Sequence, residues 1–366
     1  MVERRGTSAH LWELIDPRAS EPGIRSALSQ ILDLVNSGWT LERPIDIGSS
    51  EVRALLERHR ITTLVPLDLV AAADRAWLRN KHINIAASHL RTRSSANRIL
   101  ASLDDAGIET RVLKGLATAE LDYPNQQLRH TGDVDLAIRP NELGQAVQIL
   151  TANGHRDHPT PFHPVLLYGW TLDAPDGVEV DLHTRLFRRS PLDDELFTCG
   201  SEQLRSVPGR ALRPEHRLVH AAGHFIISPP GGTRRMSGVI DIARLLRRSD
   251  LDLDEARRFA GALGVESLVG AGIRVEAELS QRTAVLRALD TWQQPDWLER
   301  NTRLVAHRRL VLDHLGRYRE VPRGQRWRYF PTWIMPAARQ RRLLGESLVA
   351  ASLRVVGKSR PEEVPS

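Results

Sequence analysis

A short apolar run that carries two aspartates constrains this chain more than any other segment. Residues 133–138 read Asp-Val-Asp-Leu-Ala-Ile, which is typical of a β-strand. Residues i and i+2 of a strand point to the same face of a sheet, so we expect Asp133 and Asp135 to lie side by side. Like charges this close resist joint ionisation unless a cation lies between them. Carboxylate oxygens suit Mg²⁺, which itself binds phosphates, so the run predicts metal-assisted phosphoryl or nucleotidyl transfer.

A second alternating segment adds a third carboxylate. Residues 178–187 are a predicted strand that includes Glu179, Asp181 and His183 on one face. We expect Asp181 to face the cleft of the first two aspartates, because three carboxylates are a reasonable minimum for two metal ions about 3.5–4 Å apart. Glu179 is a candidate fourth carboxylate. His183 is a base, a contact to the acceptor, or a structural histidine with a hydrogen-bonded neighbour.

Two basic positions lie close to this pattern. A short predicted strand, residues 110–113, ends at Lys114 and Gly115. Glycine lets backbone N–H groups approach a phosphate closely, although the pair also suits an ordinary tight turn. Arg129 lies four residues before Asp133, where it would bind phosphate, brace the carboxylates or lie on the surface.

The combination of these motifs resembles the nucleotidyltransferase superfamily that includes DNA polymerase β, kanamycin-type aminoglycoside nucleotidyltransferases and tRNA CCA-adding enzymes. More closely, the chain resembles a bacterial family of uncharacterised nucleotidyltransferases, often found beside peptide natural-product genes. That family has a Leu-Lys-Gly turn, an Arg-x-x-Gly-Asp-x-Asp-Leu strand and a Glu-x-Asp-Leu-His strand. This chain matches them at residues 113–115, 129–136 and 179–183. The resemblance covers roughly residues 85–250.

The resemblance implies an NTP substrate and a two-metal Mg²⁺ site. Its implied metal ligands and catalytic residues are Asp133, Asp135 and Asp181, and its implied nucleotide-binding residues are Lys114, Gly115, Arg129 and Gly132. Arg235 and Asp241 match family positions that would tie the helical part to the catalytic domain or line the cleft.

The chain also departs from the family pattern. The superfamily's Gly-Ser turn is Lys-Gly here, so Lys114 would replace a serine contact as a point charge. The family's Arg-Pro-Met-Gly is Arg-His-Thr-Gly, and the Trp often found after the histidine is Thr184. Neither change removes an implied metal ligand.

The rest of the pattern predicts an α+β chain, with a small mixed β-sheet of nucleotidyltransferase type flanked by helices. Helical regions precede and follow this sheet. We expect four parts: residues 1–85 as an N-terminal helical region, 86–205 as the nucleotidyltransferase core, 206–350 as a C-terminal helical domain and 351–366 as a partly disordered tail. The predicted helices are 24–34, 51–58, 64–77, 85–105, 142–152 (capped by Asn141), 215–227, 239–248, 253–263, 267–289, 297–315 and 336–356, and the other predicted strand is 165–172.

Composition narrows the remaining classes. The single cysteine, Cys199, excludes an intramolecular disulfide, and no stretch approaches the ~20 apolar residues of a membrane helix. The first residues lack the apolar segment of a signal peptide, so we expect a cytoplasmic protein with no membrane partner. The P-loop, Gly-x-Gly-x-x-Gly and Gly-x-Ser-x-Gly motifs are absent.

Three functions therefore stay open. The first is an Mg²⁺-dependent, pyrophosphate-releasing transferase that moves an NMP from an NTP, such as ATP, to a hydroxyl or other nucleophile. Its acceptor would be a small molecule, peptide or protein, in natural-product biosynthesis. The second is a non-catalytic nucleotide-binding accessory protein of a peptide-modifying system. The third is an RNA-directed transferase, because residues 323–330 interleave arginines with aromatics and 339–342 add basic charge to the net +6. His220 and His224 have a spacing that suits zinc, but residue 221 is alanine, which favours packed histidines.

Overall fold

The computed structural model describes residues 11–12, 15–40, 44–157, 169–187, 195–227 and 235–293. Except for residue 227, these segments belong to one compact unit. The predicted helices 297–315 and 336–356, the Arg/aromatic segment 323–342 and the tail from residue 351 lie outside the described residues.

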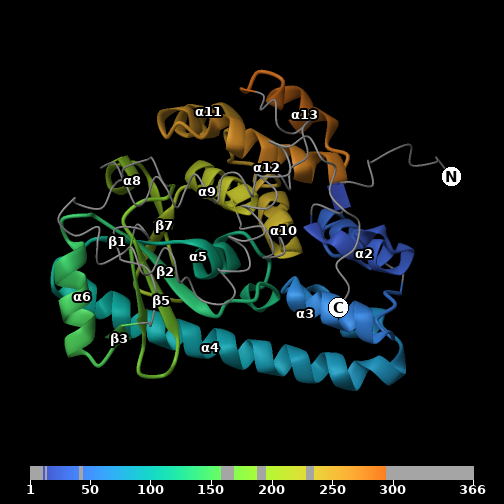
Figure 1. The fold of residues 1–366 in the computed structure, drawn as a ribbon, viewed down its shortest axis with the longest axis horizontal. Coiled ribbons are helices and arrows are strands. Elements are labelled where there is room, and N and C mark those ends of the chain that lie inside the picture. The colour runs from blue at the N-terminus through green and yellow to red at the C-terminus, as the bar shows by residue number, and fades with distance from the viewer. Residues whose placement is uncertain are drawn as a thin grey trace, which may run out of the picture. The chain divides into compact units, whose positions relative to one another are not determined.

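The centre of this unit is a mixed sheet whose strands lie in the order β3-β4-β5-β2-β1-β7-β6 (Figure 1). Its strands are β1 (Thr110–Val112), β2 (Asp133–Ile138), β3 (Arg156–Asp157), β4 (Gly169–Asp173), β5 (Glu179–His183), β6 (Ser201–Gln203) and β7 (Arg210–Leu212). β2 pairs parallel with β5 and antiparallel with β1, and β4 forms an antiparallel hairpin with β5. The α+β class with a mixed sheet is therefore confirmed.

The parallel pairing of β2 and β5 fixes which side chains share a face. In this register Asp133 lies opposite Glu179, and Asp135 lies opposite Asp181. The alternate residues of β2, Val134 among them, are fully buried on the other face. One face of the sheet is thus apolar, while the other carries the acidic residues.

Helices cover the apolar face. α4 and α6 contribute Leu100, Leu103 and Leu150 to the same buried cluster as Val134 and Val180 of the sheet, and in Figure 1 both helices lie against the strands. The helices are α2 (Pro22–Asn36), α3 (Ser50–Arg58), α4 (Arg75–Asp105), α5 (Lys114–Leu121), α6 (Leu143–Ala152), α8 (Glu195–Thr198), α9 (Pro214–Ile227), α10 (Met236–Leu245), α11 (Leu253–Ala262), α12 (Glu266–Leu279) and α13 (Thr283–Leu289). Short 3₁₀ turns are η1 (Pro17–Ser20), η2 (Thr62–Leu64), η3 (Leu67–Leu69), η4 (Ala72–Asp74) and η5 (Gln126–Leu128). Among the described helices, none combines the length and the apolar character that a bilayer crossing requires.

Local signals explain several helix ends. The Ser49 side chain caps α3 by accepting a hydrogen bond from the Val52 N–H at 3.1 Å. Gly107 has a φ of 73° just after α4, where glycine is favoured. The predicted Asn141 cap is wrong: Glu142 precedes α6 and makes no side-chain cap bond.

Other boundaries also differ from the predictions. α4 begins at Arg75 rather than residue 85, so the expected division between residues 85 and 86 falls inside one continuous helix. The predicted helix 64–77 is mostly 3₁₀ turns, since Pro66 lacks a backbone donor. The predicted helix 267–289 is divided into α12 and α13, and β5 ends at His183 rather than at residue 187. The described part of the predicted strand 165–172 begins at Gly169.

Candidate active site

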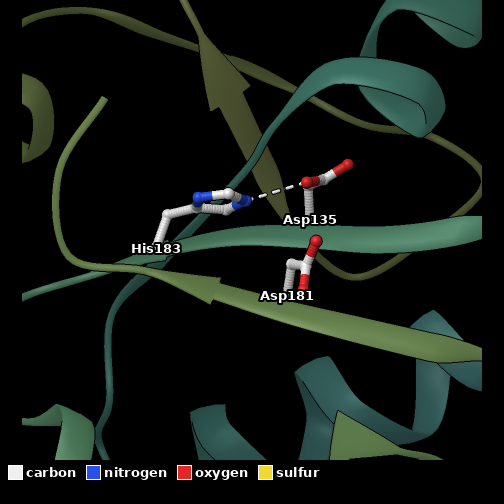
Figure 2. A group of neighbouring side chains, drawn as sticks. All are labelled: Asp135, Asp181 and His183. Atoms are coloured by element: carbon white, nitrogen blue, oxygen red, sulfur yellow. Dashed lines mark hydrogen bonds and ion pairs between the residues drawn. The ribbon is translucent and has the colours of Figure 1, made fainter. Parts of the chain in front are cut away.

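Three potential metal ligands meet where β2 and β5 pair. Ligand atoms of Asp135, Asp181 and His183 all lie within 4.8 Å of one another, the one such group among the described residues. Figure 2 shows the three side chains on the same side of the two strands. Parallel register and strand alternation together produce this grouping, because Asp135 and Asp181 are cross-strand partners and His183 follows two residues later.

Asp135 is the innermost of these groups. Its residue is 3% exposed, and its Oδ1 lies 2.8 Å from Nε2 of His183. Burial alone would raise the pKa of Asp135, but Lys114 and His183 outweigh it and hold that pKa well below its usual range. Asp135 is therefore an ionised, buried carboxylate.

Lys114 supplies the positive charge next to it. Its Nζ donates to Asp135 Oδ1 at 2.5 Å and lies 3.4 Å from Nε2 of His183. Burial opposes the charged form, but Asp135, then Asp181 and Asp133, outweigh it and raise the pKa of Lys114. One ammonium thus faces three carboxylates.

The backbone at Lys114 is strained. Its φ is 46°, in the left-handed region that non-glycine residues rarely adopt. The superfamily resemblance places a glycine at this position, which would adopt that conformation without cost. The sequence suggested a turn here, whereas the structure begins helix α5 at Lys114 directly after β1. The strain is retained where the lysine reaches the acidic group, as is common at functional sites.

Asp133 and Glu179 lie on the same face, opposite one another in the β2–β5 register. Both are half-buried, and neither belongs to the 4.8 Å group formed by described residues. Asp133 is nevertheless close enough to Lys114 to raise the pKa of that residue. Asp133 thus lies beside the group rather than within it.

Sequence reasoning missed Thr171. This residue lies opposite Asp181 in the β4–β5 hairpin, and its Oγ1 donates to Asp181 Oδ1 at 2.6 Å. The turn-forming residues 173–177, combined with strand alternation, could have revealed this pairing, because a hairpin turn sets which residues of its two strands lie opposite one another. Thr171 fixes the orientation of the Asp181 carboxylate.

The two glycines assigned to nucleotide binding have different surroundings. A Cβ on Gly115, in the first turn of α5, would lie 3.2 Å from Cγ2 of Thr131, so a larger residue would crowd that side chain. A Cβ on Gly132 would meet nothing within 4 Å of the protein. The backbone before β2 is therefore open to close approach.

Arg129, assigned to nucleotide binding, forms a buried ion pair with Asp241 of α10. Its Nε and Nη2 donate to the two carboxylate oxygens at 2.8 Å each, and its Nη1 donates to the His130 carbonyl at 2.6 Å. The Tyr123 hydroxyl donates to the same carboxylate at 2.8 Å. We call Arg129, Asp241 and Tyr123 the clamp. Arg129 is thus paired with Asp241 rather than with the carboxylates of β2, and this pair ties α10 to the entry of β2.

Two further residues sit at the edges of the site. Arg235 directly precedes α10 and helps to lower the pKa of both His130 and His224. His220, on α9, is buried, whereas His224, one turn later on the same helix, is exposed. Desolvation first, and then the positive charge of Lys114, lower the pKa of His220 far below its usual value and that of His224 to about 3. Both are neutral, and His220 is packed as expected, whereas His224 is not.

Comparisons with known proteins bear on this arrangement. Residues 47–281 match the family model described as "Uncharacterised nucleotidyltransferase". No curated protein matches the chain. Three solved chains match, including the solution structure of the antibiotic-resistance factor ANT(2'')-Ia. That structure is 17% identical, with a TM-score of 0.33, and the match covers 54% of this chain and 96% of that one.

The family match includes α3, the sheet, the acidic group and the helices up to residue 281. It extends the expected resemblance, residues 85–250, toward both termini and covers well over half of the chain. The chain belongs to the uncharacterised nucleotidyltransferase family.

Proposed function

We propose that this protein is a metal-dependent nucleotidyltransferase that moves an NMP from an NTP to a nucleophile of a small-molecule, peptide or protein acceptor. The observation that carries the proposal is the pairing of Asp135 with Asp181 across β2 and β5, beside Asp133 and a single ammonium. Carboxylates in excess of the neighbouring cations attract a further cation.

The donor set fits Mg²⁺. Asp135 and Asp181 offer carboxylate oxygens within 4.8 Å of each other, and Asp133 adds another on the same face. Hard oxygen ligands of this kind suit Mg²⁺, which completes its shell with water and phosphate oxygens. We infer that Asp133, Asp135 and Asp181 hold it. Thr171 and His183 would fix the orientation of the Asp181 and Asp135 carboxylates, respectively, through their hydrogen bonds. Bound there, Mg²⁺ would neutralise charge on the phosphates of the NTP.

The remaining groups would position the reactants. Lys114 offers a positive charge beside the acidic group, and the first turn of α5 offers backbone N–H groups around Gly115. In the reaction, an acceptor hydroxyl loses its proton to solvent as its oxygen bonds to the α-phosphorus, the bond between that phosphorus and the β-side bridging oxygen breaks, and pyrophosphate leaves. Positioning and charge neutralisation would supply most of the acceleration.

The test is pyrophosphate release. The protein is incubated with each NTP and a panel of hydroxyl-bearing small molecules and peptides, with and without Mg²⁺. We expect Mg²⁺-dependent release with at least one acceptor, and none with the double variant Asp133→Asn, Asp135→Asn. A folded double variant with the wild-type rate would end the metal hypothesis. NTP binding without turnover across the panel would favour the nucleotide-binding accessory protein.

A further inference from the structure

The end of α3 contacts the start of α10 beside the acidic group. The Met236 N–H donates to Nδ1 of His59 at 3.0 Å, and the Ser237 N–H donates to the His59 carbonyl at 3.4 Å. His59 is fully buried, so this contact is part of the core. Arg60 and Arg235 directly flank the two bonded residues, which brings two arginines from distant parts of the sequence to one place.

The same segment also contacts the entry to β2. Thr63 Oγ1 donates to the Leu128 carbonyl at 2.7 Å, two residues before His130. Burial first, and then Arg60 and Arg129, lower the pKa of His130 to about 4, while Asp133 acts in the opposite direction. Arg60 therefore lies within electrostatic reach of His130, three residues before β2 begins at Asp133.

Arg60 is unusual among the basic residues of this region. Its φ is 55°, and the Ile61 N–H donates to the Leu56 carbonyl at 3.0 Å, which is the helix ending that glycine normally completes. An arginine in this conformation is strained. Glycine would adopt this conformation without strain, so a change of Arg60 to glycine removes the side chain at no cost to the backbone.

The charge of Arg60 is also uncompensated. Nearby basic side chains are paired: Arg53 with Asp74 at 2.5 Å, Arg58 with Asp16 at 2.5 Å and Lys81 with Glu57 at 2.8 Å. In the part of the chain that the structure describes, no hydrogen-bond or ion-pair partner of the half-buried Arg60 guanidinium is found. A guanidinium that has no partner among the described residues can donate hydrogen bonds to an oxyanion.

We propose that Arg60, with Arg235 and His130 beside it, binds the phosphate tail of the NTP. This inference rests on the proposed function, because cations held by the aspartates would draw the phosphates to the Asp133 end of β2. The N-terminal helical region then contributes directly to substrate binding. An anionic group on the acceptor offers the same oxyanion chemistry, and the test separates the two.

The decisive variant is Arg60→Gly, since glycine relieves the backbone strain while it removes the guanidinium. With Mg²⁺ present, affinities for ATP, AMP and inorganic tripolyphosphate are measured by calorimetry. We expect ATP and tripolyphosphate to bind about tenfold or more weakly, as for loss of a charge-assisted contact, and AMP to bind as before. The melting temperature should stay the same or rise.

Gln281→Gly is the matched control. Gln281 also has a φ of 55° after a helix, is exposed and lies outside this arginine group. It should gain stability in the same way and keep every affinity. Wild-type protein that binds neither ATP nor any other NTP would defeat the proposed function itself, and this inference with it. Wild-type ATP binding that is unchanged in Arg60→Gly would overturn this inference alone, and weaker binding of an acidic acceptor only would assign Arg60 to the acceptor.

Discussion

Two charge clusters, both largely screened from solvent, involve residues at or just before β2, and they are built differently. In the clamp, one guanidinium faces one carboxylate, and Tyr123 adds a further hydrogen bond to the Asp241 oxygens. In the acidic group, the Lys114 ammonium faces Asp135, Asp181 and Asp133. The clamp is balanced in charge, whereas the acidic group is not.

The difference separates a structural role from a chemical one. A buried pair with both partners satisfied holds elements together, and removal of one partner leaves an uncompensated charge. A cluster with more carboxylates than cations stays repulsive until another cation binds. The comparison thus predicts that the same substitution, Asp→Asn, will cost stability in the clamp and activity in the acidic group.

The largest effect is expected from Asp135→Asn. Loss of a buried, ionised ligand should lower the rate of pyrophosphate release by about 10³-fold, since charge stabilisation of several kcal/mol is removed. Asp241→Asn, assayed at a temperature where it stays folded, should keep a rate within about tenfold of wild type. Equal losses in the two variants would erase the distinction between the clusters.

Stability should show the opposite order. Asp241→Asn leaves Arg129 buried beside a neutral amide, and we expect the free energy of unfolding to fall by about 3–5 kcal/mol. Asp135→Asn should cost less, because Lys114 keeps Asp181 and Asp133 nearby. Urea unfolding of both variants checks this, and a larger loss in Asp135→Asn would contradict it.

Metal binding should stabilise the fold through one cluster only. Added Mg²⁺ at about 100 times its dissociation constant should raise the free energy of unfolding by about 2.7 kcal/mol. Thermal melts in Mg²⁺ and in EDTA measure the shift. Asp135→Asn should lose it, while Asp241→Asn should melt lower in both buffers and keep the difference.

The smallest effect concerns the neutral histidines beside the acidic group. The pKa of His224 is about 3 in the fold, against about 6.5 unfolded. Because the unfolded chain binds the proton more readily, stability is fully present above pH 6.5 and falls as the pH drops toward 3. Because the His224 side chain is exposed, its cost should be only a fraction of the ~1.4 kcal/mol per pH unit that a fully buried group would show in that window. Unfolding curves of His224→Gln at pH 7 and 5 should show a shallower loss than wild type, and an identical loss would mean that His224 is charged in the fold.

The sequence predicted the grouping of acidic side chains better than the architecture around it. Strand alternation was enough to place Asp133 and Asp135 on one face. It did not reveal which aspartate lies opposite Asp181, because register depends on pairing between strands far apart in the chain. Helix α5 escaped notice since its residues 115–119 are all buried, which removes the polar face that marks a helix.

The clamp was beyond local reasoning for a similar reason. Arg129 and Asp241 are 112 residues apart, and nothing within either segment shows that the two meet. The resemblance to the family gave both positions a role, but not each other as partners. Strands β6 and β7 have three residues each, too few for a periodic pattern.

A divalent cation bound between β2 and β5 is central to the proposed chemistry. Crystals grown with Mn²⁺, a heavier substitute for Mg²⁺ at oxygen ligands, and a non-hydrolysable ATP analogue would locate it by anomalous scattering. We expect an anomalous peak within about 2.5 Å of carboxylate oxygens of Asp135 and Asp181. A nucleotide bound elsewhere, or a saturated complex whose Mn²⁺ avoids both carboxylates, would contradict the account.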